Sequence, residues 1–264
     1  MHYPKINSLW RRAEDAKRLI KGDYACDALP NIREWDVTEK VDGTNIRITF
    51  LQADGQRTQP SIEGRTDAAI IPSFLLDSLK PFASWDLFDK AFHLDGPNFE
   101  VTLFGEGYGE KIQTGGGDYR EGTGLILFDV VINGRWMDRV AVLEVASVFG
   151  LPVVPYLGRM RESAVVGLVK SRPESQCSRN PRAIEGVVAK ASYGICDSHG
   201  VPIMFKLKCR DFSDEETDQQ RLWESTMKQN WEMLVKFWQA EPPIGDLHLA
   251  KKEQTKETKD EVST

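Results

Sequence analysis

The chain has 264 residues, of which 41% are hydrophobic and 28% charged, as is typical of a soluble globular protein. No apolar run is long enough to span a membrane, and the first residues lack the apolar core of a signal peptide, so we expect a cytoplasmic protein without membrane partners. The net charge of −6 excludes a uniformly basic nucleic-acid-binding protein, and four scattered cysteines without a Cys-x-x-Cys pair argue against structural zinc.

Helices and short strands are both predicted along the chain. The helices are expected from Asn7 or Ser8 to about Lys21, after Ser73, over residues 85–93, and from an Asp138 cap to Phe149. The strands are expected over residues 35–40, 46–50, 99–104, 125–131, 153–154, 184–191 and 202–208, with a further hairpin across Asn133-Gly134. Antiparallel hairpins mixed with helices indicate an α+β fold.

A hairpin is predicted around Lys40. Trp35 and Val37 alternate with polar residues before the lysine, and the segment 46–50 alternates in the same way after it. Asp42-Gly43 lies between the two strands and is a strong signal for a tight turn. Lys40 would therefore end a strand beside the turn, where a rigid element could present it to a ligand. Taken alone, a Lys-x-Asp-Gly sequence is more typical of a solvated lysine at a hairpin tip.

Charged and aromatic residues recur at the ends of the later strands in a fixed order. They are Gly64-Arg65-Thr66, Phe104-Gly105-Glu106, Phe128-Asp129, Glu185-Gly186-Val187-Val188-Ala189-Lys190 and Lys206-Leu207-Lys208. Lys206 and Lys208 share one face of a strand, because side chains repeat every second residue. Together with the Lys40 segment, this series resembles the covalent nucleotidyltransferase superfamily of polynucleotide ligases and capping enzymes. In detail it is most similar to RNA ligases of the phage RNA ligase 2 type.

The resemblance implies a nucleotidyltransferase domain of antiparallel sheets, flanked by helices, that hold a nucleotide between them. We expect this adenylyltransferase domain to cover residues 1–212, followed by a short helical segment over 213–241 and a disordered tail over 242–264. DNA ligases and capping enzymes of the superfamily carry a further β-barrel after the Lys-x-Lys strand. The residues after Lys208 are too few and too helical for that barrel, which favours an RNA ligase.

The resemblance also implies a reaction with ATP and Mg²⁺. Lys40 would attack the α-phosphate of ATP to form lysyl-AMP, and AMP would then pass to an RNA 5′-phosphate before the 3′-hydroxyl displaces it. The remaining roles would be Lys206 and Lys208 on the α-phosphate, Asn45 and Lys190 at the reacting phosphates, Glu39 at the base edge through its backbone, Arg65 on the ribose and phosphate, Glu106 on the ribose hydroxyls, Phe128 stacked on adenine, and Glu185 on Mg²⁺. Asp129 is assigned to structure rather than chemistry.

The expected partner is a pair of RNA ends, held in a nicked duplex during RNA repair. The short helical C-terminus offers little surface for gripping a strand, and a duplex aligns the two ends by itself. Arg33, Arg47, Arg57, Lys111 and Arg120 are candidates for a basic RNA-binding face. Three alternatives stay open: a minimal DNA ligase, a capping-type guanylyltransferase, and a non-catalytic module that binds nucleic acid.

Overall fold

The structure is a computed structural model that describes residues 1–14, 19–212, 227–228 and 230–233. The chain divides into two compact units, Met1–Glu215 and Glu216–Thr264, and the fold described below is that of the first unit. Residues 227–228 and 230–233 are helical, but most of the predicted C-terminal segment and all of the predicted tail lie outside the described residues. No helix in the described part is long and apolar enough to cross a membrane.

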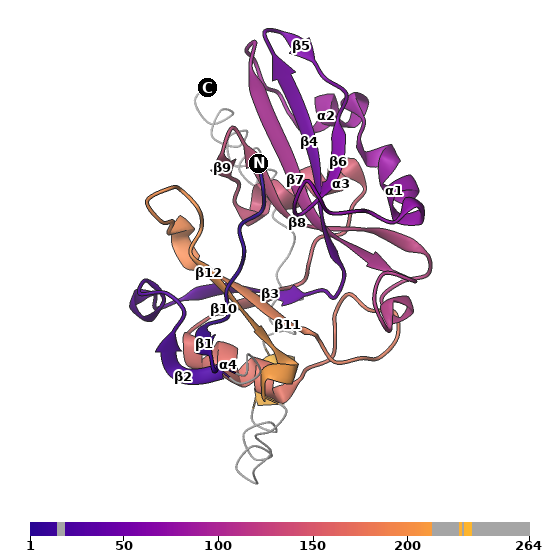
Figure 1. Cartoon of the computed structure of the whole chain (residues 1–264). Coiled ribbons are helices and arrows are strands. Elements are labelled where there is room, and N and C mark those ends of the chain that lie inside the picture. The colour runs from indigo at the N-terminus through magenta and orange to yellow at the C-terminus, as the bar shows by residue number, and fades with distance from the viewer. Residues whose placement is uncertain (15–18, 213–226, 229, 234–264) are drawn as a thin grey trace, which may run out of the picture. The chain divides into compact units, whose positions relative to one another are not determined.

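Two antiparallel sheets form the body of the first unit (Figure 1). The larger has six strands in the order β5-β4-β7-β8-β9, with β6 also pairing β4. These strands are β4 (Thr44–Ala53), β5 (Gln56–Arg57), β6 (Ser61–Gly64), β7 (Phe99–Gly109), β8 (Thr123–Ile132) and β9 (Arg135–Trp136). Their alternating apolar residues send one face into the main core, so this face needs a cover of helices.

Three helices supply that cover. They are α1 (Ser73–Leu79), α2 (Trp85–Ala91) and α3 (Arg139–Phe149), and their apolar residues pack in one cluster with those of β4, β7 and β8. The Asp138 carboxylate accepts a hydrogen bond from the backbone N–H of Ala141 at 2.9 Å, so the predicted cap of α3 is confirmed. The other face of the sheet is left for the site.

The smaller sheet has four strands in the order β10-β3-β11-β12. They are β3 (Trp35–Lys40), β10 (Tyr156–Met160), β11 (Gly186–Ala191) and β12 (Met204–Lys208). Helix α4 (Glu162–Ser171) contacts β11 and β12, and the rings of Trp35 and Phe205 meet edge to face at 4.7 Å. Short 3-10 turns complete the unit: η1 (Leu29–Asn31), η2 (Lys80–Phe82), η3 (Gly116–Asp118), η4 (Ser192–Gly194) and η5 (Cys209–Phe212). The α+β prediction with antiparallel sheets is confirmed.

The predicted helix at the start of the chain is wrong. The chain instead forms β1 (Trp10–Arg12), which pairs antiparallel with β2 (Leu19–Tyr24). Just before β1, Ser8 forms a parallel bridge with Lys206 of β12. Pairing with the sheet and with a second strand therefore outweighs the local capping signal, because helix propensity is a weak preference that tertiary contacts override.

The predicted hairpin around Lys40 is also wrong, although both of its strands exist. β3 pairs with β10 and β11 in the smaller sheet, whereas β4 pairs with β5, β6 and β7 in the larger one. Alternation of apolar residues predicts a strand but not its partner, and the two strands bury their apolar faces in different places. Asp42-Gly43 therefore carries the chain from one sheet to the other.

The remaining predicted elements agree with the structure apart from residues 153–154. Val153 makes only an isolated bridge to Leu127, so this segment is not a strand. The helix α4 and the strands β6 and β10 were outside the predictions, because short strands and a helix with weak capping signals give little periodicity to detect.

Candidate active site

Lys40 is the last residue of β3, at the point where the chain leaves the smaller sheet for the larger one. The crossing is tight at Gly43, where an added Cβ would overlap the carbonyl oxygen of Gly107 and lie 2.7 Å from Cγ of Glu106. Only glycine fits this approach. The Lys-x-Asp-Gly segment thus brings Lys40 of the smaller sheet beside the Glu106 carboxylate of the larger sheet.

A chain of ion pairs links Lys40 to β12. Nζ of Lys40 lies 2.6 Å from Oε2 of Glu185, and Nζ of Lys208 lies 2.5 Å from Oε1 of the same carboxylate. Gly186 explains the convergence, because it pairs with Lys40 on one side and with Lys208 on the other. The three side chains are 20%, 14% and 18% exposed, so the cluster is sheltered but open to a ligand.

Lys206 adds a further cation on the same face of β12 as Lys208. Burial lowers the pKa of Lys206, and the charges of Lys208, Lys40 and Arg65 lower it further. Arg65 itself is exposed in the loop after β6. Four cations against one bridging carboxylate give this region a net positive charge, which suits a phosphate group.

Glu106 of β7 is a half-buried acid next to these cations. Burial raises its pKa to about 7, with Glu185 and Asp42 raising it further and Lys40 opposing them. Asn45 lies opposite Glu106 in the pairing of β4 with β7, and its Oδ1 atom is buried without a hydrogen-bond partner. The Glu106 carboxylate and the unpaired Oδ1 atom of Asn45 could both accept hydrogen bonds from the donors of a polar ligand.

Phe128 lies at a break in the pairing of β7 and β8. Phe104 pairs with Asp129 and Gly105 with Leu127, so Phe128 has no partner of its own in the register. Such a bulge re-aims side chains and is common next to active sites. The half-buried ring of Phe128 meets the ring of Tyr3 edge to face at 5.0 Å, which fixes its orientation.

Lys190 of β11 does not join the Lys40 cluster. Its Nζ atom forms an ion pair with Oδ1 of the buried Asp129 and lies 5.8 Å from the ring centre of Trp136. This pair connects β11 of the smaller sheet to β8 of the larger one. The structural role expected for Asp129 agrees with this contact, although its lysine partner was not predicted.

Glu39 is 1% exposed, and its side chain does not face the Lys40 cluster. Its carboxylate accepts hydrogen bonds from Oγ of Ser175 at 2.5 Å, from the Gln176 amide at 2.9 Å and from Sγ of Cys177 at 3.3 Å. The side chain therefore anchors the loop between α4 and β11. No local sequence pattern predicts this contact, which joins residues more than a hundred positions apart.

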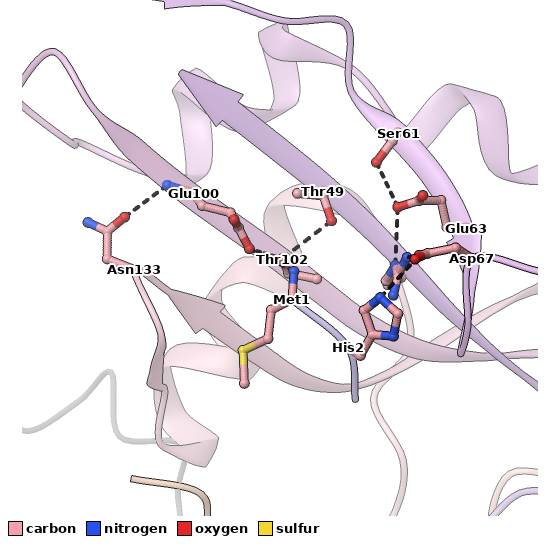
Figure 2. A network of polar contacts seen from close by, with 10 residues as sticks. Met1, His2, Thr49, Ser61, Glu63, Asp67, Glu100, Thr102 and Asn133 are labelled. Atoms are coloured by element: carbon pink, nitrogen blue, oxygen red, sulfur yellow. Dashed lines mark hydrogen bonds and ion pairs between the residues drawn. The ribbon is translucent and has the colours of Figure 1, made fainter. Parts of the chain in front are cut away.

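The predicted basic face is wrong at two of its five positions. Arg47 is buried, with its guanidinium on the carboxylates of Glu63 and Asp67. Figure 2 shows this network, in which Oδ1 of Asp67 also lies 3.1 Å from Nε2 of His2. Arg57 forms two hydrogen bonds with Asp89. Side chains from neighbouring strands and helices neutralise both arginines, which sequence spacing does not reveal.

A sequence model of the RNA ligase family matches residues 33–208, which is more than half of the chain. The chain belongs to the RNA ligase family. Every residue assigned to the site, from Glu39 to Lys208, lies within the matched segment. A search of curated proteins found no match.

Solved structures of RNA ligases also resemble the chain. A Naegleria gruberi RNA ligase with PPi is 20% identical, with a TM-score of 0.47, and the match covers 67% of this chain and 49% of that one. A variant of that ligase with ATP and Mn is 18% identical, with a TM-score of 0.49, over 78% of this chain and 57% of that one. The chain thus spans about half the length of these structures.

The residues present fit the magnesium ion that members of the RNA ligase family are expected to use. Within the described part of the chain, no three His, Cys, Asp or Glu side chains gather as a metal site. Mg²⁺ nevertheless binds well through one or two carboxylates together with substrate phosphates. Glu185, which pairs with Lys40 and Lys208, is a carboxylate of that kind.

Proposed function

We propose that this RNA ligase family member joins RNA 3′-hydroxyl and 5′-phosphate ends with ATP, through an AMP group carried on Lys40. The observation that carries the proposal is the chain of ion pairs from Lys40 through Glu185 to Lys208. It places a primary amine at a strand end, among cations that suit a phosphate, and beside the half-buried Glu106. Lys208 also ends a strand and pairs with Glu185, whereas Lys40 is the lysine whose charge acts on Glu106.

The reaction has three displacements at phosphorus. The amine of Lys40 attacks the α-phosphorus of ATP, so that a P–N bond forms, pyrophosphate leaves and the amine loses a proton. The RNA 5′-phosphate then takes AMP from Lys40, and the RNA 3′-hydroxyl finally displaces AMP to form the phosphodiester. Lys206 and Lys208 would offset the charge that develops on the phosphoryl oxygens, and they are already in place before the reaction.

The nucleotide would bind between the two sheets. Phe128 presents a half-buried ring for stacking on adenine, and Glu106 and Asn45 offer acceptors for the ribose hydroxyls and neighbouring groups. The amide N–H of Glu39 already donates to Pro155 at 2.9 Å, so we assign the contact with the base edge to its carbonyl. Arg65 and Lys190 would complete the contacts to phosphate.

Mg²⁺ would be held by Glu185 together with phosphate oxygens of ATP. When bound, the ion neutralises phosphate charge and orients the leaving pyrophosphate. Glu185 would then face both the ion and the two lysines that it pairs with in the ligand-free protein. We further propose a role in RNA repair in the cytoplasm.

The proposed substrate is a nick in duplex RNA, because a complementary strand aligns the two ends and makes joining nearly intramolecular. The test compares joining of a nicked RNA duplex, a nicked DNA duplex and single-stranded RNA at equal concentrations of ends, with ATP or GTP. We expect ATP-dependent sealing of the RNA nick, weakening as salt rises. Preference for DNA would favour a minimal DNA ligase, and labelling by GTP would favour a guanylyltransferase.

A further inference from the structure

Tyr3 packs on the larger sheet, and its hydroxyl also lies 3.7 Å from Sδ of Met204 in the smaller sheet. Its side chain is buried, and its ring meets those of Phe104, Phe128 and Trp136 edge to face at 5.1, 5.0 and 5.5 Å. Figure 2 shows the preceding residue, His2, against Asp67 in the loop that follows β6. Tyr3 therefore enters the unit along the face of the larger sheet that carries the site.

The hydroxyl of Tyr3 and the ammonium of Lys190 share one carboxylate. Tyr3 donates to Oδ2 of Asp129 at 2.7 Å, while Lys190 pairs with Oδ1. Asp129 is 2% exposed, so these two partners replace water at the carboxylate. The hydrogen bond from Tyr3 to Oδ2 fixes the plane of the Asp129 carboxylate. The orientation of this plane determines where Oδ1 binds the ammonium of Lys190.

Burial raises the pKa of Tyr3 well above its usual range, and the charges of Asp129 and Glu106 raise it further. The hydroxyl therefore keeps its proton and remains a donor throughout the working range of pH. Lys190 is 28% exposed beside this pair, so its ammonium can reach a ligand while Asp129 holds it. Within this network Asp129 is buried, whereas the Lys190 side chain is partly exposed.

We propose that Tyr3 is a positioning residue of the nucleotide site with two separable parts. Its hydroxyl acts through Asp129 on the place of Lys190, and its ring acts on the orientation of Phe128. The proposal rests on the proposed function, in which Lys190 serves the phosphates and Phe128 the base. It assigns to the start of the chain a role in lysyl-AMP formation.

Two substitutions separate the two parts in single-turnover AMP transfer to Lys40. Tyr3→Phe keeps the ring, so the maximal rate should fall about tenfold, the scale of a hydrogen bond to a charged group, with the half-saturating ATP concentration unchanged. Tyr3→Leu also removes the edge-to-face contact with Phe128, so the half-saturating ATP concentration should rise roughly three- to tenfold. Equal kinetics in Tyr3→Phe and the wild type would contradict the proposal.

Tyr24→Phe is the matched control. The hydroxyl of Tyr24 also donates to a carboxylate, that of Glu162 at 3.0 Å, but the pair lies outside the site. We expect unchanged transfer kinetics in Tyr24→Phe. A loss there as large as in Tyr3→Phe would mean that any missing hydroxyl slows the enzyme by loosening the fold, and the positioning role would fall.

A double-mutant cycle tests whether Tyr3 acts through Lys190. In a Lys190→Met background the added Tyr3→Phe substitution should cause no further loss of maximal rate, because the side chain that it positions is gone. Fully additive losses would show that the hydroxyl acts by another route. Thermal unfolding of each variant confirms that the comparison is made on folded protein.

A readout that needs no catalysis keeps this proposal separate from the proposed function. With its carboxylate partner less fixed in Tyr3→Phe, Lys190 should be acylated faster by an amine-reactive ester, measured by peptide mass spectrometry. Lys80, which pairs with Asp77 outside the network, is the internal reference. If the wild type took up no AMP, the proposed function would fail, while unchanged Lys190 reactivity in Tyr3→Phe would overturn the positioning role.

Discussion

At the scale of single residues, Glu106 shows how the fold changes the chemistry of a motif residue. An isolated glutamate at a strand end is an ordinary surface acid. Here β7 buries its carboxylate against Gly43, and this burial raises its pKa to about 7. A carboxylate in this state exchanges its proton near neutral pH, so the contact proposed with ribose hydroxyls would depend on pH in that range.

The raised pKa of Glu106 predicts how stability depends on pH. The unfolded chain loses this proton near pH 4.5 and the folded protein only near pH 7, so stability should fall between these values and stay lower above them. Glu106→Gln removes the ionisable group, so it should stabilise the protein at pH 8 by up to about 3 kcal/mol relative to its effect at pH 5.

Urea unfolding at pH 5, 6, 7 and 8 measures this difference. Glu100→Gln is the control, because Glu100 lies on the same strand with its side chain 41% exposed. The control should show no comparable trend. The result that would contradict this prediction is a Glu106→Gln variant with the same stability relative to the wild type at pH 5 and pH 8. Glu106 would then not keep its proton up to about pH 7 in the folded protein.

At the scale of the elements, the site depends on how closely β11 lies between its two neighbours. Gly186 separates Lys40 from Lys208, and a Cβ at this position would overlap the carbonyl oxygen of Leu207. The backbone cannot yield there without moving β12. The register of three strands, rather than any single side chain, therefore sets the distance between Lys40, the proposed nucleophile, and Lys208.

Substituting Gly186 should change the spacing of β11 and β12 and hence the distance between Lys40 and Lys208. Gly186→Ala should push β11 and β12 apart, lower the free energy of unfolding by roughly 1–3 kcal/mol as overpacking does, and reduce AMP transfer by more than tenfold. Gly117→Ala is the matched control, because an added Cβ there would lie 3.5 Å from Cγ of Glu110, which is ordinary contact. Full activity in Gly186→Ala would show that the spacing of the lysines does not matter.

The sequence allowed prediction of most strands and of three helices, because each of these has clear alternation or a capping residue. It did not allow prediction of the partners of β3 and β4, since the Asp42-Gly43 signal fits a hairpin and a crossing between sheets equally well. The helix expected at the N-terminus failed for a related reason. Its local signals cannot show that Ser8 bridges Lys206 across almost the whole chain.

At the scale of the whole unit, the site exists only because two sheets meet. The order of the motifs predicts which residues belong to it, and all of these residues lie within the segment that the family model matches. The contacts that hold them could not be predicted, because Tyr3 with Asp129 and Glu39 with Ser175 are each more than a hundred residues apart. These contacts depend on packing, which has no local sequence pattern.

The charge of the molecule follows the same division. The net charge of −6 describes the chain as a whole. Locally, Lys208, Lys40 and Arg65 lie close enough to Lys206 to lower its pKa, in addition to the effect of burial. Two of the other arginines expected at the surface are neutralised by acids. RNA would therefore meet a concentrated basic site rather than a broad basic face.

The most direct test of the account is the mass of the protein after incubation with ATP and Mg²⁺. We expect the gain of one AMP, released by acid and stable to hydroxylamine as a phosphoramidate is, and located on Lys40 by peptide mapping. Lys40→Ala and Lys40→Arg should gain none, because a guanidinium is not a nucleophile at neutral pH, while Lys80→Ala should gain AMP normally. AMP uptake that persists in Lys40→Ala would contradict the central claim.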